Sequence, residues 1–300
     1  MRYLIYATIL FSFGPVLVRL GLAEGLDSNH LVVLRLAVAF PSFLLAVVVS
    51  GSLPKAGLKP REIPFVFLIS VVGMGTAMTC FFRSVSILGA SLASLLGAVT
   101  PVVTALLAYF FLSRPVTKRQ ATSMFASFLG VGFLTVPATG LLAFGKIDGA
   151  SLGGVGYSLL ATLCASGAAL GFERYVINKS PLVAAFHVTG FMFVFFASLF
   201  GFPEGRFTPR IWEIILVLGI FTWFVPFMLF FYGIRELGAS GAALIQNAGP
   251  LMTVLTARFL FGETLVPAQL VGMVLLISSV YVFALERKKL RENDLTLPEA

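Results

Sequence analysis

The segment Phe82–Leu112 reads FRSVSILGASLASLLGAVTPVVTALLAYFFL, and the segment Phe231–Phe261 reads FYGIRELGASGAALIQNAGPLMTVLTARFLF. The second segment lies 149 positions after the first, and the letters LGAS and a later proline occur in both at one register. Apolar sequences match by chance at Leu, Ala and Phe, but a shared LGAS with aligned Pro101 and Pro250 is harder to obtain. The pattern predicts two related halves, 1–149 and 150–285, followed by a polar cytoplasmic tail at 286–300.

The composition of the whole chain excludes a soluble fold. Hydrophobic residues make up 58% of the sequence and charged residues 11%, whereas soluble domains carry about 25% charged residues. Ten apolar runs approach the roughly 20 residues that a membrane-spanning helix needs, and they lack the alternation of barrel strands. We therefore predict an all-α integral membrane protein with ten transmembrane helices. The predicted spans are 3–22, 31–50, 63–82, 91–112, 120–139, 151–172, 181–202, 211–232, 238–261 and 267–285.

The odd number of spans in each half fixes their relative orientation. With five helices in the first half, the second half must enter the membrane from the opposite side. The sequence therefore predicts two inverted five-helix repeats. Inverted repeats are typical of secondary transporters, in which two equivalent bundles rock about a site at the membrane midplane.

The positive charges are distributed unevenly between the two sides of the predicted membrane. Of the 21 Lys and Arg residues, fourteen fall on the inner side if the N-terminus is inside, six fall on the outer side, and Arg35 lies within a span. Because cytoplasmic loops are enriched in Lys and Arg, this bias predicts both termini in the cytoplasm. We expect a multi-pass plasma membrane protein of a bacterial inner membrane. The net charge of +8 then reflects topology and not a nucleic-acid partner.

The ten helices, the tandem repeats and the Gly-Ala-Ser…Pro segments resemble the drug/metabolite transporter superfamily, in particular its ten-helix EamA-like family. Arg35, in Leu34-Arg35-Leu36, also occupies a familiar position, and Phe261-Gly262-Glu263-Thr264 resembles the acidic motif that often follows the ninth helix. The equivalent place after the fourth helix departs from the motif, because Ser113-Arg114-Pro115 has no acid. The resemblance covers nearly the whole chain and implies a transporter without specifying its substrate.

Polar residues near the two aligned prolines are the first candidates for a substrate site. Pro101 and Pro250 each lack an amide hydrogen, so they bend their helices and free carbonyl groups within the membrane. Symmetric bends favour a central cavity, although membrane helices also use proline for structural kinks. The polar residues around the prolines are Gln246, Asn247 and Thr253 in one half and Ser94, Thr100 and Thr104 in the other. We favour the two amides as site residues, whereas the hydroxyl groups more often hydrogen-bond between helices.

Two ionisable residues and two aromatic residues complete the predicted set. Arg35 would cost roughly 2.5–3.5 kcal/mol in the bilayer unless it faces the interior. It could hold a substrate carboxylate or phosphate, with help from Arg19, or it could cap carbonyls of a neighbouring helix. His187 is more often a packing donor than a proton relay. Tyr109 and Trp223 combine a flat ring with a polar group that can meet a ligand.

The sequence favours a carrier over other classes of membrane protein. No Asp or Glu lies deep within a predicted span, which disfavours an exporter of cationic drugs because such proteins generally bury a carboxylate. We predict a secondary transporter, an exporter of small polar metabolites such as amino acids, that works by alternating access at a mid-membrane cavity. A facilitator or exchanger of an anionic or nucleotide-linked metabolite is the alternative. A membrane-embedded enzyme or a non-transporting membrane component is the alternative of another class.

The expected partners follow from this prediction. They are a small-molecule substrate and the lipid bilayer, without nucleic acid, and a homodimer is left open. No cofactor or metal is expected, because the sequence holds only His30 and His187 and no metal-ligand spacing. An enzyme is disfavoured because no buried acid pair or activated nucleophile is evident.

Overall fold

The structure, a computed structural model, describes residues 1–88, 93, 96–113, 116–134, 149–204, 207–249, 251–252 and 267–296. Every regular element within these ranges is helical. The elements of the first half are α1 (Arg2–Phe11), α2 (Gly14–Ala23), α3 (Ser28–Val49), η1 (Leu53–Lys55), α4 (Ile63–Phe67), η2 (Leu68–Gly75), α5 (Thr76–Leu88), α7 (Thr100–Leu112) and α8 (Lys118–Leu134). Those of the second half are α9 (Gly149–Val176), α10 (Pro181–Phe200), α11 (Pro209–Gly219), η4 (Ile220–Phe224), α12 (Val225–Gln246) and α14 (Pro267–Thr296).

The helices have the length and the surface of a membrane protein. Within the described residues, six helical segments are long and apolar enough to cross a bilayer, and two shorter apolar helices accompany them. Large apolar side chains face outward, as shown by Phe110 and Phe111, which are 72% and 77% exposed. Such side chains would be costly in water but suit contact with lipid. The prediction of an all-helical membrane protein is therefore confirmed.

Short polar side chains define where several of these helices begin. Asp27 accepts a hydrogen bond from the backbone N–H of Asn29 at 2.9 Å and so caps α3. Ser180 and Thr208 cap α10 and α11 in the same way, and a proline follows each of them in the first turn. These caps satisfy amide hydrogens that have no partner within the helix. The loops before α3, α10 and α11 therefore end at defined residues.

The irregularities of the helices recur at the same spacing as the sequence repeat. The π-helical segment η2 ends at Gly75 and the π-helical segment η4 ends at Phe224, which is 149 positions later. A turn interrupts the helix at 98–99 and another does so at 247–248. The helices α8 and α14 begin at Lys118 and Pro267 with this offset. The two halves therefore share their local geometry as well as their sequence.

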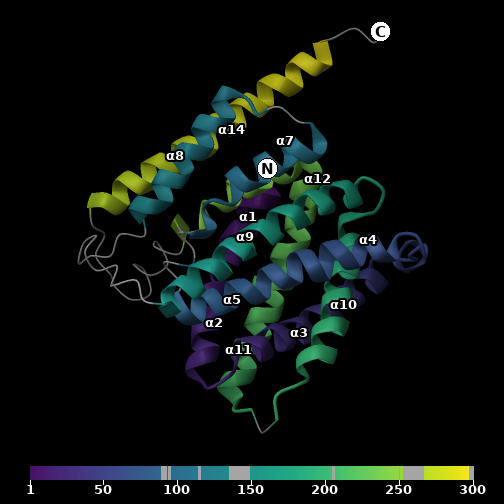
Figure 1. The fold of residues 1–300 in the computed structure, drawn as a ribbon. Coiled ribbons are helices and arrows are strands. Elements are labelled where there is room, and N and C mark those ends of the chain that lie inside the picture. The colour runs from purple at the N-terminus through teal and green to yellow at the C-terminus, as the bar shows by residue number, and fades with distance from the viewer. Residues whose placement is uncertain are drawn as a thin grey trace.

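The pairs of helices that pack together are also related by the repeat. The helix α5 packs on α9 and α1 packs on α12, so exchanging the halves converts the first pair into the second. The pairs α3 with α10 and α8 with α14 each convert into themselves. Figure 1 shows α8 and α14 crossing side by side at one edge of the bundle, while α3, α10 and α11 gather at the opposite end. This pattern gives the fold an approximate internal twofold relationship.

Two details of the backbone refine the predicted spans. The predicted span 3–22 is interrupted at Ser12 and Phe13, because α2 starts afresh at Gly14 with Pro15 in its first turn. The predicted start of a span at 238 coincides with a kink inside α12, where Gly238 has φ 73° and ψ 171°. A side chain at this left-handed φ would be strained, so glycine suits the kink. The Glu173 carboxylate accepts the N–H of Ala239 at 2.9 Å just beyond it.

Candidate functional site

A cavity of about 320 Å³ lies between elements of both halves. Its wall combines the end of α1 and the start of α2, parts of α3, η2 and α5, and the helix break at 97–100. The middle of α9, η4 and the end of α12 complete it. The polar groups on this wall come from Thr8, Ser12, Arg35, Thr100, Ser158, Thr162, Gln246 and Asn247. Within the described wall, Arg35 is the only ionisable side chain. Its volume lies at the lower end of the roughly 300–1,000 Å³ typical of small-molecule sites.

The two helix breaks meet at one side of this cavity. Ala98 and Val99 form the turn before α7, and Asn247 and Ala248 form the turn after α12. The Asn247 side-chain amide donates to the Ala98 carbonyl at 2.9 Å and to the Ser127 hydroxyl at 3.1 Å. Asn247 and Ala98 are themselves 149 positions apart, so equivalent positions of the two halves touch. Equivalent residues can touch only close to the axis that relates the two halves.

Pro101 explains why the first helix break occurs at this place. Pro101 lies in the first turn of α7, is buried and does not line the cavity. Its missing amide hydrogen leaves carbonyls of the preceding turn without their helical donor. The Thr100 hydroxyl donates to the Gly97 carbonyl at 2.5 Å, and Asn247 supplies the donor to Ala98. Side chains therefore satisfy the carbonyls that the break leaves free.

Gln246 differs from its neighbour Asn247. The Gln246 side chain is half-buried, lines the cavity and makes no hydrogen bond within the part of the chain that the structure describes. Asn247 is only 6% exposed, and the two hydrogens of its amide nitrogen are used on the Ala98 carbonyl and on the Ser127 hydroxyl of α8. An amide without a protein partner can donate to and accept from a ligand. Gln246 is therefore the amide that is available to a bound molecule.

Arg35 enters the cavity from α3 and packs against two aromatic rings. Its guanidinium carbon lies 4.7 Å from the centre of the Trp223 ring and 5.7 Å from that of Phe82. One terminal nitrogen, Nη2, donates to the backbone carbonyl and to the hydroxyl of Thr222 in η4. A π-helical turn leaves such carbonyls poorly matched within the helix, so the contact ties α3 to η4. Ring faces attract the cation and partly replace lost hydration.

Trp223 is held in place by its own contacts. Its indole N–H donates to the Thr189 hydroxyl of α10 at 3.2 Å. Its ring stacks on Phe227, with centroids 4.3 Å apart and an interplanar angle of 21°. Trp223 is therefore a fixed flat surface on the cavity wall, and its N–H is already occupied.

The structure thus brings together five of the twelve predicted site residues. Arg35, Thr100, Trp223, Gln246 and Asn247 all line the one cavity. Three others, Ser94, Pro250 and Thr253, lie outside the described residues. Four of the twelve do not line it: Pro101, Thr104, Tyr109 and His187.

Thr104 and Tyr109 have contacts that place them outside the cavity. The Thr104 hydroxyl is buried against α9, where it donates to the Thr100 carbonyl at 2.8 Å and lies 3.0 Å from the Ser166 hydroxyl. Tyr109 is 53% exposed on the outer face of α7, where it packs edge-to-face on Phe110. Arg19, which the sequence suggested as a helper of Arg35, is exposed on α2 and is not part of the described wall.

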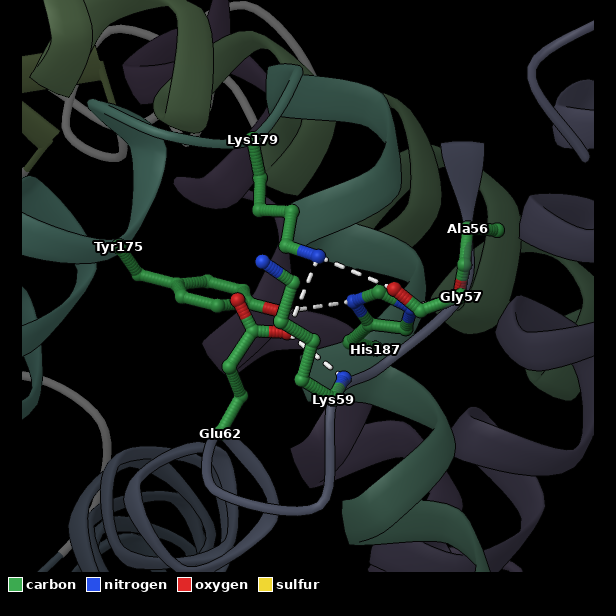
Figure 2. A network of polar contacts seen from close by, with 7 residues as sticks. All are labelled: Ala56, Gly57, Lys59, Glu62, Tyr175, Lys179 and His187. Atoms are coloured by element: carbon green, nitrogen blue, oxygen red, sulfur yellow. Dashed lines mark hydrogen bonds and ion pairs between the residues drawn. The ribbon is translucent and has the colours of Figure 1, made fainter. Parts of the chain in front are cut away.

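His187 belongs to a second polar cluster, shown in Figure 2. Its Nδ1 lies 2.8 Å from the Tyr175 hydroxyl, and its Nε2 lies 2.8 Å from the Ala56 carbonyl. Because a carbonyl can only accept, Nε2 carries the hydrogen and Nδ1 accepts from the tyrosine. Beside them, the Lys179 ammonium donates to the Gly57 carbonyl at 3.0 Å and pairs with the Glu62 carboxylate at 3.1 Å. The cluster ties the loop after α3 to α9 and α10, away from the cavity.

The carboxylate of Glu62 in this loop is poised to stay ionised. It accepts the backbone N–H of Lys59 at 2.9 Å, and this bond is the main reason that the pKa of Glu62 lies below its ordinary value. Burial, the second-largest effect, raises the pKa, and the hydrogen bond and charge of the nearby Lys179 lower it again. The loop is therefore latched to the second half at neutral pH.

Sequence reasoning missed four hydroxyl residues of the cavity wall. Thr8 lies one turn before the break between α1 and α2 and Ser12 lies in it, whereas Ser158 and Thr162 lie one turn apart on α9. Their hydroxyls mostly bond to carbonyls of their own helices, as Thr8 does to Leu4 at 2.7 Å. Pro15 was the available signal for the first pair, because it predicts a break within the span. Nothing in the sequence separates Ser158 and Thr162 from other mid-helix hydroxyls.

Comparisons with known proteins agree with this fold. The chain is 26% identical over 263 residues to the "Uncharacterized transporter YyaM" of Bacillus subtilis (strain 168), which covers 82% of this chain and 81% of that protein. It is 26% identical over 285 residues to "Uncharacterized transporter YdfC" of the same organism, with coverages of 93% and 89%. A solved crystal structure matches with a TM-score of 0.77 at 14% identity, covering 96% of this chain and 97% of that one.

A family model matches the two halves separately. The description of that model is "EamA-like transporter family", and it matches residues 2–136 and again residues 152–285. The two matched segments divide the chain at the point where the repeat in the sequence and the repeat in the helix irregularities divide it. The chain therefore belongs to the EamA-like transporter family.

Proposed function

We propose that this protein is a secondary carrier that exports small polar metabolites, such as amino acids or related compounds, by alternating access around the cavity. Ten spans arranged as two inverted repeats, 1–149 and 150–285, are part of the proposal. Inverted repeats place a site at their interface, and the rocking of one bundle against the other opens it to each side in turn. The internal twofold relationship of the helices supports this arrangement.

The observation that carries the proposal is the position and chemistry of the cavity. It lies where the equivalent helix breaks of the two halves meet, and the half-buried amide of Gln246 points to it without a protein partner among the described residues. Irregular backbone inside a membrane is tolerated where protein or a water-filled space satisfies it. A polar molecule held there meets groups that can replace part of its hydration.

Counterflow in proteoliposomes tests the proposal. The panel holds amino acids, organic anions, sugars and nucleosides, and wild type is compared with Gln246→Ala and with the control Asn178→Ala, which removes an exposed loop amide. We expect counterflow with at least one class and, for Gln246→Ala, a KM raised on the order of fivefold, as for one lost hydrogen bond. Asn178→Ala is expected to match wild type. Absence of flux for every class would refute the carrier and favour a membrane-embedded enzyme or a non-transporting component.

The orientation in the membrane is tested separately. The proposed location is a bacterial inner membrane with both termini in the cytoplasm, because the Lys and Arg residues favour that side. Single cysteines placed at residue 2 and in the tail are labelled with a membrane-impermeant maleimide in intact cells. Both are expected to stay unlabelled until the cells are broken. Labelling of only one of them in intact cells would refute the inverted repeats.

A second candidate function follows from Arg35. A facilitator or exchanger of an anionic metabolite would use the one positive charge of the described cavity wall. The same counterflow panel separates it from the leading proposal, because the organic anions would then exchange and the amino acids would not.

A further inference from the structure

The charge of Arg35 has no counter-ion in the described part of the chain. Its side chain lines the cavity and is only 5% exposed. The ion pairs seen between described residues are Met1 with Glu236, Lys179 with Glu62, and Arg210 with Glu24, and none of these three involves Arg35. An arginine side chain cannot lose its proton in a protein. The cavity therefore holds one full positive charge that the described wall does not neutralise.

The hydrogen bonds of Arg35 are also incomplete. A guanidinium has five N–H donors, and Nη2 uses its two on the carbonyl and hydroxyl of Thr222. Nη1 contacts only the sulfur of Met78 at 3.8 Å, which is a weak acceptor, and Nε is buried without any partner. If Arg35 served only to cap Thr222, there would be no reason to bury the donors of Nη1 and Nε as well. Among the described residues, no oxygen acceptor meets Nη1 or Nε of the guanidinium.

The rest of the wall suits an uncharged, partly apolar body. Phe11, Met74 and Phe81 lie on the same cavity as Arg35, and the wall also includes Thr8 and Ser12, which flank Phe11 in the sequence. No described wall residue is a carboxylate that could hold an ammonium group. A monoanion would neutralise the site, whereas a zwitterion would leave its net charge at one and would bury an ammonium without a counter-ion.

We propose that the substrate is a small monocarboxylate without an ammonium group, and that Arg35 binds its carboxylate through the donors that Thr222 leaves free. This proposal rests on the carrier function proposed above, and it selects the anionic metabolites of the second candidate over the amino acids of the leading one. The position 149 residues after Arg35 is Ala184, which is buried, so only one half of the protein supplies the charge. Carboxylate oxygens give charge-assisted hydrogen bonds with arginine, which are about twice as strong as neutral ones.

Matched pairs of compounds test the proposal on the wild-type protein. L-lactate is compared with L-alanine, and 3-phenyllactate with L-phenylalanine, so that a hydroxyl replaces the ammonium on the same carbon skeleton. Counterflow is measured at pH 8, where all four carboxyl groups are ionised, and flux into empty liposomes is subtracted. We expect the hydroxy acid of at least one pair to exchange about tenfold faster than its amino acid, because both compounds offer Arg35 the same carboxylate but only the amino acid leaves an ammonium unpaired in the cavity. Equal or faster exchange of both amino acids would overturn the proposal.

Variants then assign the effect to Arg35. Arg35→Gln removes the charge, Arg35→Lys keeps it without the planar fork, and Arg19→Gln removes an exposed charge outside the described wall as the matched control. Hydroxy-acid exchange is expected to fall at least about tenfold in Arg35→Gln, to fall less in Arg35→Lys and to be unchanged in Arg19→Gln. Unchanged exchange in a folded Arg35→Gln protein would overturn the role of this residue. If Arg35→Gln does not fold, Arg35→Lys and the wild-type pairs decide.

A binding measurement separates this inference from the carrier proposal. The melting temperature of the purified protein in detergent is recorded with each of the four compounds. Because a ligand stabilises the folded state that it binds, the hydroxy acids should raise the melting temperature more than the amino acids do. Binding of hydroxy acids without any flux would refute the carrier alone. Flux that prefers amino acids, with no stabilisation by hydroxy acids, would refute the monocarboxylate assignment alone.

Discussion

The hydrogen bonds of Asn247 predict a measurable coupling between α12 and α8. The amide of Asn247 donates to the Ala98 carbonyl and to the Ser127 hydroxyl, and all three groups are buried or nearly so. Hydrogen bonds between membrane helices average about 0.6 kcal/mol, with a maximum near 1.7 kcal/mol. Asn247→Ala should therefore lower the free energy of unfolding by about 1.2 kcal/mol, and Ser127→Ala by about 0.6 kcal/mol.

The double variant distinguishes a direct bond from two independent effects. Once Asn247 is gone, Ser127→Ala has no bond left to remove, so the double variant should also lose only about 1.2 kcal/mol. The interaction energy is then about 0.6 kcal/mol, and it is measured from the unfolding equilibria of wild type, the two single variants and the double variant in detergent. Strictly additive losses would show that the Asn247–Ser127 bond does not form. Transport is recorded in parallel, to separate loss of stability from loss of substrate binding.

Three further predictions concern packing, pH and the second polar cluster. Gly75→Ala should lower the stability in thermal melts by about 1–3 kcal/mol, because the added methyl group would lie 2.3 Å from the Phe196 ring. The control Gly156→Ala has open space around the added methyl group and should be neutral or stabilising in the same melts. Because Glu62 has a lowered pKa in the folded protein, its contribution to stability is present above its unfolded pKa of about 4.3 and is lost as the pH falls through the folded value. Melts between pH 7 and pH 3 should therefore show a smaller loss for Glu62→Gln than for wild type, and equal losses would contradict the latch. Tyr175→Phe should cost about 0.6 kcal/mol by removing the bond to His187 while leaving the KM for substrate unchanged, and a changed KM would place this cluster in the transport path.

Much of the fold could be predicted because the bilayer imposes long apolar runs. The starts of α8 and α10 lie within two residues of the starts of the predicted spans. The offset of 149 positions found from the sequence also relates the ends of η2 and η4 and the starts of α8 and α14. The break at 98–99 lies just ahead of Pro101, where the missing amide hydrogen has its effect. The π-helical segments η2 and η4 could not be predicted, because packing against neighbouring helices decides whether a helix widens there.

The candidate site was less accessible to sequence reasoning. Sequence position places Arg35 and His187 within spans, but it does not say which neighbour each side chain faces. Arg35 lines the cavity beside the ring of Trp223, and the two residues are far apart in the sequence. His187 instead meets Tyr175 and a carbonyl of the loop after α3. The sequence gives no reason to distinguish Gln246 from its neighbour Asn247. Only the structure shows that the Asn247 amide is hydrogen-bonded to Ala98 and Ser127.

The contact between Ala98 and Asn247 has a mechanical consequence. When two halves of a carrier swap their shapes, points far from their common axis travel furthest and points on it barely move. In the proposed cycle, a bond at that place can survive in both states and serve as the pivot.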